Sequence, residues 1–387
     1  MRFIEMRRKS VLPIYVFVIL CVPLSTNLLD IYKKGVVKLS PDLEYGKNTD
    51  WSNLLYDQIS SFIIARDGSL FITTPRQDKV FKFDSNGNFL KSFGQKGQGP
   101  GDLQEPRSLS ILDDKYLVIR EISSTGRISL FDLNGQFVTI LQAGRSVLDC
   151  VSLQNNRIAF LTWSTSQEKD NLIANYIVFI RDISSGDEIK VDEFHLIYKR
   201  EAQFIRGNYG SLYGSVFLGR SDIGDKLLVG CSSDPKLSIY GTDGKLIRSF
   251  LLTNMNLIKI DGAMKNLFFK EAEERINRQI RFRAQSLELL KKARQDDVLP
   301  EYVPYYRDIV IDPEGHILVF KFFLFEKNNK YLFQVYSPEG HFICETKIDA
   351  GDYEPIGQAL LHQSYGYGPF QKKGDDASFY FFRMKLQ

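Results

Sequence analysis

The sequence contains few residues of the kinds that hold metals or form disulfide frameworks. It has four cysteines and four histidines among 387 residues, and no C-x-x-C pair. Cys150, Cys231 and Cys344 are widely spaced, and each lies beside strand-like sequence. We therefore predict buried free thiols, with no disulfide framework, no metal site and no bound cofactor.

Catalytic signatures are also absent. The sequence has no H-E-x-x-H motif and no G-x-S-x-G turn, which removes the usual signatures of zinc proteases and α/β-hydrolases. His195, His316, His341 and His362 are far apart in the sequence. Surface or core positions are the preferred interpretation for them, although histidines from distant segments can still converge in a closed ring of repeats.

Excess charge is small and confined to one end of the chain. Fifty basic residues oppose 47 acidic ones, a net charge of +3, which does not indicate a nucleic-acid partner. The excess lies in the first 25 residues, where Arg2, Arg7, Arg8 and Lys9 precede an apolar run over residues 11–24. As a helix this run reaches only about 21 Å, short of the roughly 30 Å hydrocarbon layer of a bilayer.

The N-terminal run therefore has the length and flanks of a secretory signal. We predict that residues 1–26 are a signal peptide and that the protein is exported, to the periplasm, the cell surface or the medium. An uncleaved signal anchor is the alternative, because no clean small-residue cleavage site follows the run. Membrane association is expected only through this segment, if it is retained.

Two units recur along the rest of the chain. One is a turn followed by a short apolar strand, beginning near residues 69, 115, 157, 226, 316 and 378. The other is a hairpin with alternating apolar residues around a D-x-x-G type turn. Hairpins of this type start at Val80, Ile128, Leu237 and Phe333, with a looser copy from Ile177. Internal repetition at such spacing is typical of solenoids and propellers.

The chemistry of these units predicts four-stranded antiparallel sheets. Alternation with a period of two buries one face of a strand, and Gly87, Gly135, Gly244 and Gly340 can supply the positive φ of a tight turn. Six copies predict an all-β, six-bladed β-propeller over residues 35–387. The last copy lacks an outer hairpin, and we expect the strand-like segment from Gly35 to Tyr45 to supply its missing outer strand.

A glycine-rich segment carries a family resemblance. Residues 94–106, GQKGQGPGDLQEP, follow one hairpin and precede an apolar strand. They resemble the linker of NHL-repeat six-bladed β-propellers, and are most similar to those of exported bacterial propeller proteins. The resemblance implies the fold and leaves function open, since such propellers serve as binding platforms and, in a minority, as enzymes. The segment lacks the G-K-[ST] ending of a phosphate loop, so we interpret it as a blade connector.

A helical insertion is predicted between two of the repeats. Residues 264–297 contain no Gly or Pro and are rich in good helix formers. Apolar residues recur at helical spacing at Ile276, Ile280, Ala284, Leu287 and Leu290. We expect this stripe to pack across one propeller face. A docking or gating role over the channel mouth is the alternative, and its basic contact face would comprise Arg275, Arg278, Arg281 and Arg283.

Two Tyr- and Gly-rich segments are the remaining candidates for a binding surface. They cover residues 209–220 and 362–371, and flexible glycines beside tyrosines give an adaptable contact surface. The candidate residues are Arg206, Tyr209, Tyr213, Arg220, Tyr365 and Tyr367. Ordinary loop packing is the competing interpretation for each. The carboxylates at turns, Asp84, Asp132 and Asp243, fit turn capping better than catalysis.

The leading functional hypothesis is an exported, monomeric binding module. It would recognise a protein, peptide or glycan on the face that the insertion modifies, and no residue is assigned a catalytic role. The alternative is a propeller enzyme, a lyase or a lactone or ester hydrolase, with a metal in its central channel.

Overall fold

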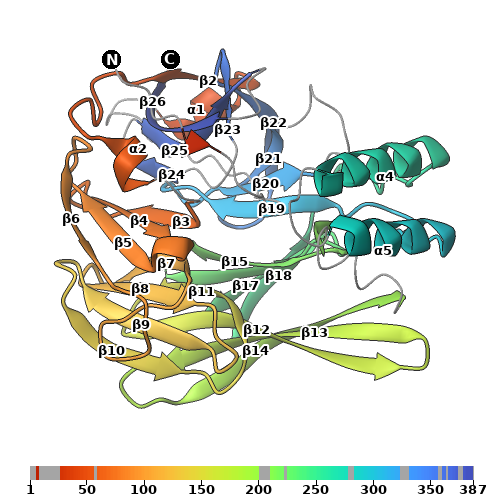
Figure 1. The fold of residues 1–387 in the computed structure, drawn as a ribbon, viewed down its shortest axis with the longest axis horizontal. Coiled ribbons are helices and arrows are strands. Elements are labelled where there is room, and N and C mark those ends of the chain that lie inside the picture. Colours follow the sequence, from red (N-terminus) through yellow and green to blue (C-terminus); the bar gives the residue numbers. More distant parts are fainter. Residues whose placement is uncertain are drawn as a thin grey trace.

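The described strands form four four-stranded antiparallel sheets and one ten-stranded sheet, in which the fifth and sixth blades are joined through β2 (Val36–Pro41). The computed structural model describes residues 6–7, 27–55, 59–199, 210–221, 225–277, 283–322, 331–355, 360–362, 365–373 and 378–386. Figure 1 shows the sheets succeeding one another around the molecule in the order of the sequence. The six-bladed β-propeller predicted from the repeats is therefore confirmed.

Each of the first five blades has the same strand order, from the innermost strand outward. The first blade comprises β3 (Ser61–Ile64), β4 (Leu70–Thr74), β5 (Lys79–Phe83) and β6 (Phe89–Phe93). The second comprises β7 (Pro106–Leu112), β8 (Tyr116–Glu121), β9 (Arg127–Asp132) and β10 (Phe137–Gln142). The third comprises β11 (Val147–Leu153), β12 (Arg157–Glu168), β13 (Asn171–Asp182) and β14 (Glu188–Lys199).

The fourth and fifth blades repeat this arrangement. The fourth comprises β15 (Val216–Ser221), β16 (Lys226–Cys231), β17 (Lys236–Gly241) and β18 (Leu246–Leu251). The fifth comprises β19 (Tyr306–Ile311), β20 (Ile317–Lys321), β21 (Leu332–Tyr336) and β22 (Phe342–Asp349). Short helical turns lie between the strands: α1 (Leu28–Tyr32), α2 (Trp51–Leu54), η1 (Pro75–Gln77) and η3 (Gly210–Tyr213).

The geometry of the hairpin turns explains why glycine recurs in the repeat. Gly135 adopts φ +77°, and a Cβ at this position would come within 2.5 Å of Phe93 in the preceding blade. Gly340 has φ +85° and the same relation to Phe250. Each turn thus needs glycine for its backbone and for close packing between blades. The capping role predicted for Asp84, Asp132 and Asp243 is also confirmed, since each side chain accepts a hydrogen bond from a backbone N–H of its own turn.

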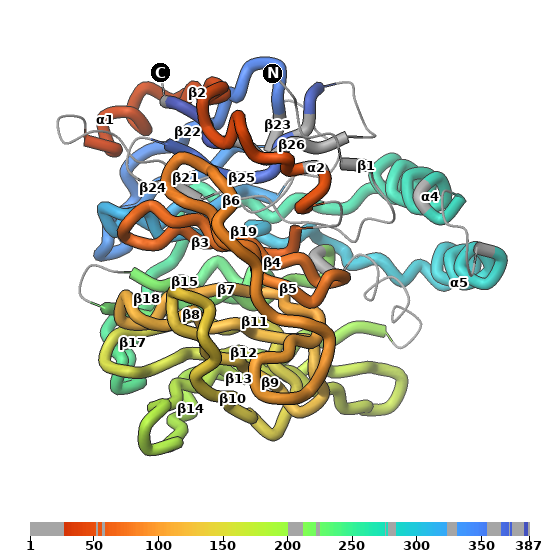
Figure 2. The backbone as a smooth tube through the Cα atoms, turned by 60° about the vertical axis from the view of Figure 1, so that its left-hand side comes forward, coloured from red at the N-terminus to blue at the C-terminus, as the bar shows by residue number. Residues whose placement is uncertain are grey.

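The sixth blade joins the two ends of the chain. It contains β25 (Tyr365–Lys372) and β26 (Ser378–Leu386), with β23 (Tyr353–Pro355) and β24 (Leu360–His362) on the inner side. Its outer strand is β2 (Val36–Pro41), which pairs antiparallel with β26 and parallel with β22. Figure 2 shows β2 beside β22 and β26. The predicted strand donation is confirmed. The short β1 (Met6–Arg7) also pairs with β26.

One detail of the repeat assignment is wrong. The repeat pattern predicts that the apolar strand near residue 378 is the sixth copy of the unit that forms the second strand of each blade. The sheet instead gives the second position to β25 and the third to β26. The Gly- and Tyr-rich sequence of β25 hid this strand, because it lacks the apolar run of its counterparts.

The insertion consists of two helices instead of one continuous segment. They are α4 (Gly262–Asn277) and α5 (Arg283–Gln295), and they lie side by side in Figures 1 and 2. Lys265 Nζ lies 2.7 Å from Asp297 Oδ1, which joins the start of α4 to the end of α5. The two helices are therefore antiparallel. No helix among the described residues is both long and apolar enough to cross a membrane.

The apolar side of this helical hairpin belongs to the largest buried cluster. Phe268, Phe269, Ile276 and Leu290 are buried in it together with residues of β13, β14 and β16. Of the predicted stripe, Ile276 and Leu290 are buried, Leu287 is partly buried, Ala284 is exposed, and Ile280 lies outside the described residues. The hairpin is thus packed onto the third and fourth blades.

Candidate binding site at the channel mouth

The innermost strands begin at the face of the propeller that also carries the insertion. The chain enters each blade at the start of its innermost strand, and α4 and α5 lie in the connection that leads to β19. Turns between first and second strands, such as the one containing Arg66, lie at the opposite face because antiparallel strands reverse direction. We call the first the insertion-bearing face.

Three innermost strands share a bulge close to this face. The pairing register shifts between Pro106 and Ser108 in β7, between Val147 and Asp149 in β11, and between Tyr306 and Asp308 in β19. A bulge leaves one residue outside the ladder and redirects neighbouring side chains. Ser108, Asp149 and Asp308 therefore occupy equivalent positions in three blades. With Arg120, which pairs with Ser108 across the sheet, they form what we call the channel mouth.

Arg120 links two blades at the channel mouth. Its Nε donates to Ser108 Oγ at 3.1 Å, and its Nη1 donates to the Val147 carbonyl of the next blade at 3.3 Å. No carboxylate among the described residues forms an ion pair with it, and burial lowers the pKa of this guanidinium. Both hydrogen-bond partners are neutral groups, and the charge of Asp149 acts on Arg120 without a hydrogen bond or ion pair between them.

Two aspartates, Asp149 and Asp308, lie at the channel mouth, and neither forms an ion pair with Arg120. Asp308 is only 2% exposed and accepts one hydrogen bond, from the Ile309 amide at 3.0 Å. Burial raises the pKa of Asp308 well above its ordinary value, and the charge of Asp149 adds to the effect. Burial also raises the pKa of Asp149, against the opposing charge of Arg120. Both groups hold their protons to a higher pH than an exposed aspartate does.

Neighbouring arginines at this level are engaged in packing. The Arg307 guanidinium stacks 5.7 Å from the Phe320 ring centroid, and burial lowers its pKa to about 10. Arg107 Nη2 donates to Glu105 Oε2 at 3.1 Å. Arg220 extends from the fourth blade to the second, where its Nη1 donates to the Ile111 carbonyl at 2.9 Å. Arg120 differs from them in being held by hydrogen bonds from two blades at the bulge itself.

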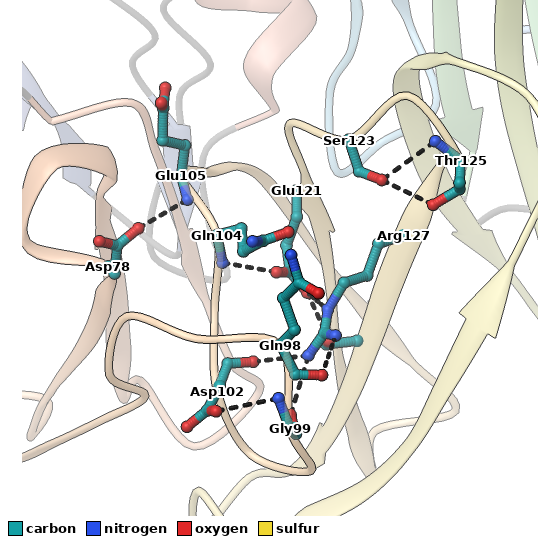
Figure 3. Close-up of polar contacts among 11 residues, drawn as sticks. Asp78, Gln98, Gly99, Asp102, Gln104, Glu105, Glu121, Ser123, Thr125 and Arg127 are labelled. Atoms are coloured by element: carbon teal, nitrogen blue, oxygen red, sulfur yellow. Dashed lines mark hydrogen bonds and ion pairs between the residues drawn. The ribbon is translucent and has the colours of Figure 1, made fainter.

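The glycine-rich connector lies close by in the sequence and has a structural role. Arg127 Nε pairs with Glu121 Oε1 at 3.0 Å, and its other nitrogens donate to the carbonyls of Gln98, Gly99 and Asp102. Glu121 in turn accepts from the Gln104 amide at 2.6 Å. Figure 3 shows this network converging on the Arg127 guanidinium. The interpretation of residues 94–106 as a blade connector is confirmed, since they join β6 to β7.

The structure separates the residues that sequence patterns proposed as one binding surface. Tyr213 Oη donates to the Val298 carbonyl at 2.7 Å, between the third blade and the insertion. Arg220 spans inner strands, as described above. Tyr365 and Tyr367 lie on β25, where the Arg383 guanidinium is 4.3 Å from the Tyr365 ring centroid. Their binding roles stay predictions.

Other proposed residues fall outside what the structure describes. They are Arg206, Tyr209, Arg278 and Arg281, and for Arg275 and Arg283 only the backbone is described. The side chain of His362 is likewise not described.

The histidines whose side chains are described lie away from the channel mouth. His316 is buried and its Nδ1 lies 3.0 Å from Asp312 Oδ2, which also accepts a hydrogen bond from Tyr32. His195 and His341 are exposed. Within the described ranges, no group of three or more His, Cys, Asp or Glu side chains is arranged to hold a metal ion.

Sequence patterns missed the channel mouth for a simple reason. Arg120, Asp149 and Asp308 each lie in a short strand, YLVIRE, VLDCVSL or YRDIVI, and match no catalytic or binding motif. The available signal was a charged residue within an otherwise apolar strand. Burying a charged side chain is costly, so a charged residue in a buried strand indicates either a paired partner or a functional site.

A comparison with family models supports the fold. Residues 49–202 match a family model described as "6-bladed beta-propeller". No curated protein sequence matches. Among solved structures, a member of the DUF4221 family from Bacteroides vulgatus is 12% identical, with a TM-score of 0.48 over 91% of this chain and 96% of that one.

Two further structures show the same degree of likeness. A Bacteroides fragilis protein described as exported is 13% identical, with a TM-score of 0.46 over 91% of this chain and 99% of that one. Virginiamycin B lyase from Staphylococcus aureus is 10% identical, with a TM-score of 0.44 over 85% and 95%. Likeness at this level says nothing about activity. By its sheets and by the match of residues 49–202, the chain is a six-bladed β-propeller.

Proposed function

We propose that this propeller is an exported binding module that takes a protein or peptide partner at the channel mouth, on its insertion-bearing face. The observation that carries the proposal is Arg120, a guanidinium enclosed by protein whose two hydrogen-bond partners are both neutral. A guanidinium with no carboxylate in direct contact can donate further hydrogen bonds to a ligand that supplies negative charge or acceptors.

The insertion supports the choice of a macromolecular partner. Its buried residues hold the helical hairpin firmly against two blades, so that its outer side has a defined position. Apolar side chains remain exposed on the hairpin and at its base: Leu257 (44%), Leu267 (39%), Leu289 (40%) and Tyr302 (40%). Apolar groups exposed beside polar ones on a rigid element are typical of protein contact surfaces.

Site-specific photocrosslinking tests which face binds the partner. A photoreactive amino acid is placed at Ile122, which is 47% exposed beside the channel mouth, and as a matched control at Arg66 on the opposite face. Both variants are expressed as the full chain and irradiated in the exported fraction. We expect one discrete adduct from position 122 and none from position 66. An adduct from position 66 alone, or equal adducts from both, contradicts the proposal.

Deleting the insertion would be a poor test of its role in binding. Removal of residues 264–297 would take Phe268, Phe269 and Ile276 out of the main core and expose their neighbours on the blades. Loss of large buried side chains costs about 2–5 kcal/mol each, so loss of binding would not be separable from loss of folding.

One observation favours the enzyme alternative, a lyase or hydrolase acting in the channel. Asp149 and Asp308 are two carboxyl groups in electrostatic contact whose pKa values burial raises, a property shared with general acids. Elemental analysis of the purified protein separates the two functions. Stoichiometric calcium or zinc that is lost in Asp308→Asn would favour the enzyme.

A further inference from the structure

The outer strand of the third blade is longer than its counterparts in the other blades. β14 has 12 residues, whereas β6 has five, and β10 and β18 have six each. Each of these strands has a shift of pairing register near its start. In β14 the shift lies between Lys190 and Asp192, and the pairing with β13 then continues without interruption to Lys199. Because a bulge protects a sheet edge from further pairing, this protection is confined to the first part of β14.

The second part of β14 is a rigid and open sheet edge. No described strand pairs with its outer side. Leu196 and Tyr198 are buried in the same cluster as residues of α4 and α5, which holds the segment in place, and Figure 1 shows the strands of this blade reaching out on the side where these helices lie. Glu193, Ile197 and Lys199 are exposed, Ile197 by 65%. A fixed strand with unpaired backbone groups is a template for another strand.

The charges along this segment make it complementary to itself. Glu193 and Lys199 lie three residues to either side of Leu196. If two copies pair antiparallel about Leu196, residues at equal distances from the two-fold axis meet, so Glu193 of each chain lies opposite Lys199 of the other. The same register places Phe194 opposite Tyr198 on the other face of the sheet. Cross-strand pairs of opposite charge and of aromatic rings both stabilise a sheet.

The other outer strands lack this arrangement. Lys91 is the one charged residue of β6 and Arg248 that of β18, while β10 has none. A single cation cannot form an ion pair with its own copy. The outer edge of β22 is already covered by β2. Glu193 contacts Lys190 within its own chain, but an ion pair at exposed positions contributes little to stability and does not prevent a second partner.

We propose that the chain forms a symmetric dimer in which residues 193–199 of β14 pair antiparallel with the same segment of a second copy. The two four-stranded third blades then form one continuous sheet across the interface. The inference goes beyond the proposed function and does not depend on it, because β14 is an outer strand and the channel mouth is built from inner ones. A dimer would replace the monomer predicted from the sequence. Its interface is small, so we expect reversible association with a Kd of about 1–100 µM.

Sedimentation equilibrium measures this association. The purified protein is analysed at concentrations from about 1 to 500 µM, which bracket the expected Kd. Glu193→Lys and Lys199→Glu each place like charges opposite one another twice across the interface, so each should weaken association at least about tenfold. Arg248→Glu is the matched control, since it makes the same change of charge as Lys199→Glu on the exposed outer strand of the next blade. It should leave association unchanged.

Mixing the two charge-reversal variants tests the register itself. In an equimolar mixture of Glu193→Lys and Lys199→Glu, one chain carries lysine at both positions and the other carries glutamate at both, so opposite charges meet again in the heterodimer. We expect the mixture to associate at least as tightly as the unaltered protein. A protein that stays monomeric throughout the concentration range overturns the inference, as does a dimer that neither substitution weakens. A mixture that associates no better than each variant alone overturns the proposed register and with it the inference.

Discussion

Arg120 and Arg127 lie seven residues apart in the second blade, on β8 and β9, and serve opposite purposes. Arg127 is 5% exposed and pairs with Glu121, which is fully buried, while three backbone carbonyls accept from its remaining nitrogens. Arg120 has a hydroxyl and one carbonyl as its partners. What separates the two arginines is whether a carboxylate contacts the guanidinium directly.

The comparison shows how to separate structural from functional charge in this fold. A buried cation that is fully paired strongly destabilises the protein when it is removed, because its partner is left alone. A buried cation with no carboxylate in direct contact leaves no carboxylate unpaired when it is removed, so its removal should change stability less and binding more. Four expected outcomes follow from this distinction.

The largest effect is expected at the connector. Arg127→Ala leaves Glu121 buried without its cation and frees three carbonyls of residues 98–102, and we expect a loss of about 3–5 kcal/mol in the free energy of unfolding. Urea denaturation followed by tryptophan fluorescence measures it. The control is Arg66→Ala, at an exposed ion pair with Asp114, which should change stability by less than about 1 kcal/mol. Similar losses of unfolding free energy in Arg127→Ala and Arg66→Ala would contradict the structural role of Arg127.

An intermediate effect is expected where the ring closes. Arg383 on β26 pairs with Asp42 at 2.6 Å, just after β2, and its guanidinium lies between the rings of Tyr45 and Tyr365. Arg383→Ala should cost about 2–3 kcal/mol. Because this arginine joins the two ends of the chain, hydrogen exchange should accelerate first in β2 and β26. Uniform acceleration in all blades would contradict this local role.

The next effect depends on pH. The folded state holds a proton on Asp308 above the unfolded pKa of 3.8, so stability contributed by this group is greatest at low pH and falls as pH rises toward the folded pKa. Asp308→Asn removes that dependence. The difference in unfolding free energy between the two proteins should therefore change by about 1.4 kcal/mol for each unit of pKa shift. Parallel stability curves from pH 4 to 8 would show that Asp308 is not enclosed.

The smallest effect on stability is expected at Arg120 itself. Arg120→Gln removes a cation that no carboxylate contacts directly, and it retains a side chain that can still reach Ser108, so we expect a change below about 1 kcal/mol in either direction. Thermal unfolding and urea denaturation, run beside Arg127→Ala, give the direct comparison. A loss of more than about 3 kcal/mol would make Arg120 a structural residue like Arg127.

Much of the fold could be predicted because its signals are local. The alternation in VFKFDSNGNFL and the glycine at position 87 together specify a hairpin, and the structure has β5 and β6 there. The Tyr- and Gly-rich β25 and the break in the insertion were missed, since both depend on what the segment packs against. The channel mouth was missed because its residues are brought together from three blades.

The sequence by itself determined the repeat, the turns and the exclusion of several chemistries, because each depends on residues that are neighbours along the chain. Tertiary structure decided the use of each charge. Whether Arg120, Arg127 or Arg383 has a counter-charge depends on segments far from it or on the course of a connector. Burial then sets the energetic consequence. A charge that costs little in water either forms a strong ion pair inside the protein or leaves a desolvation cost uncompensated.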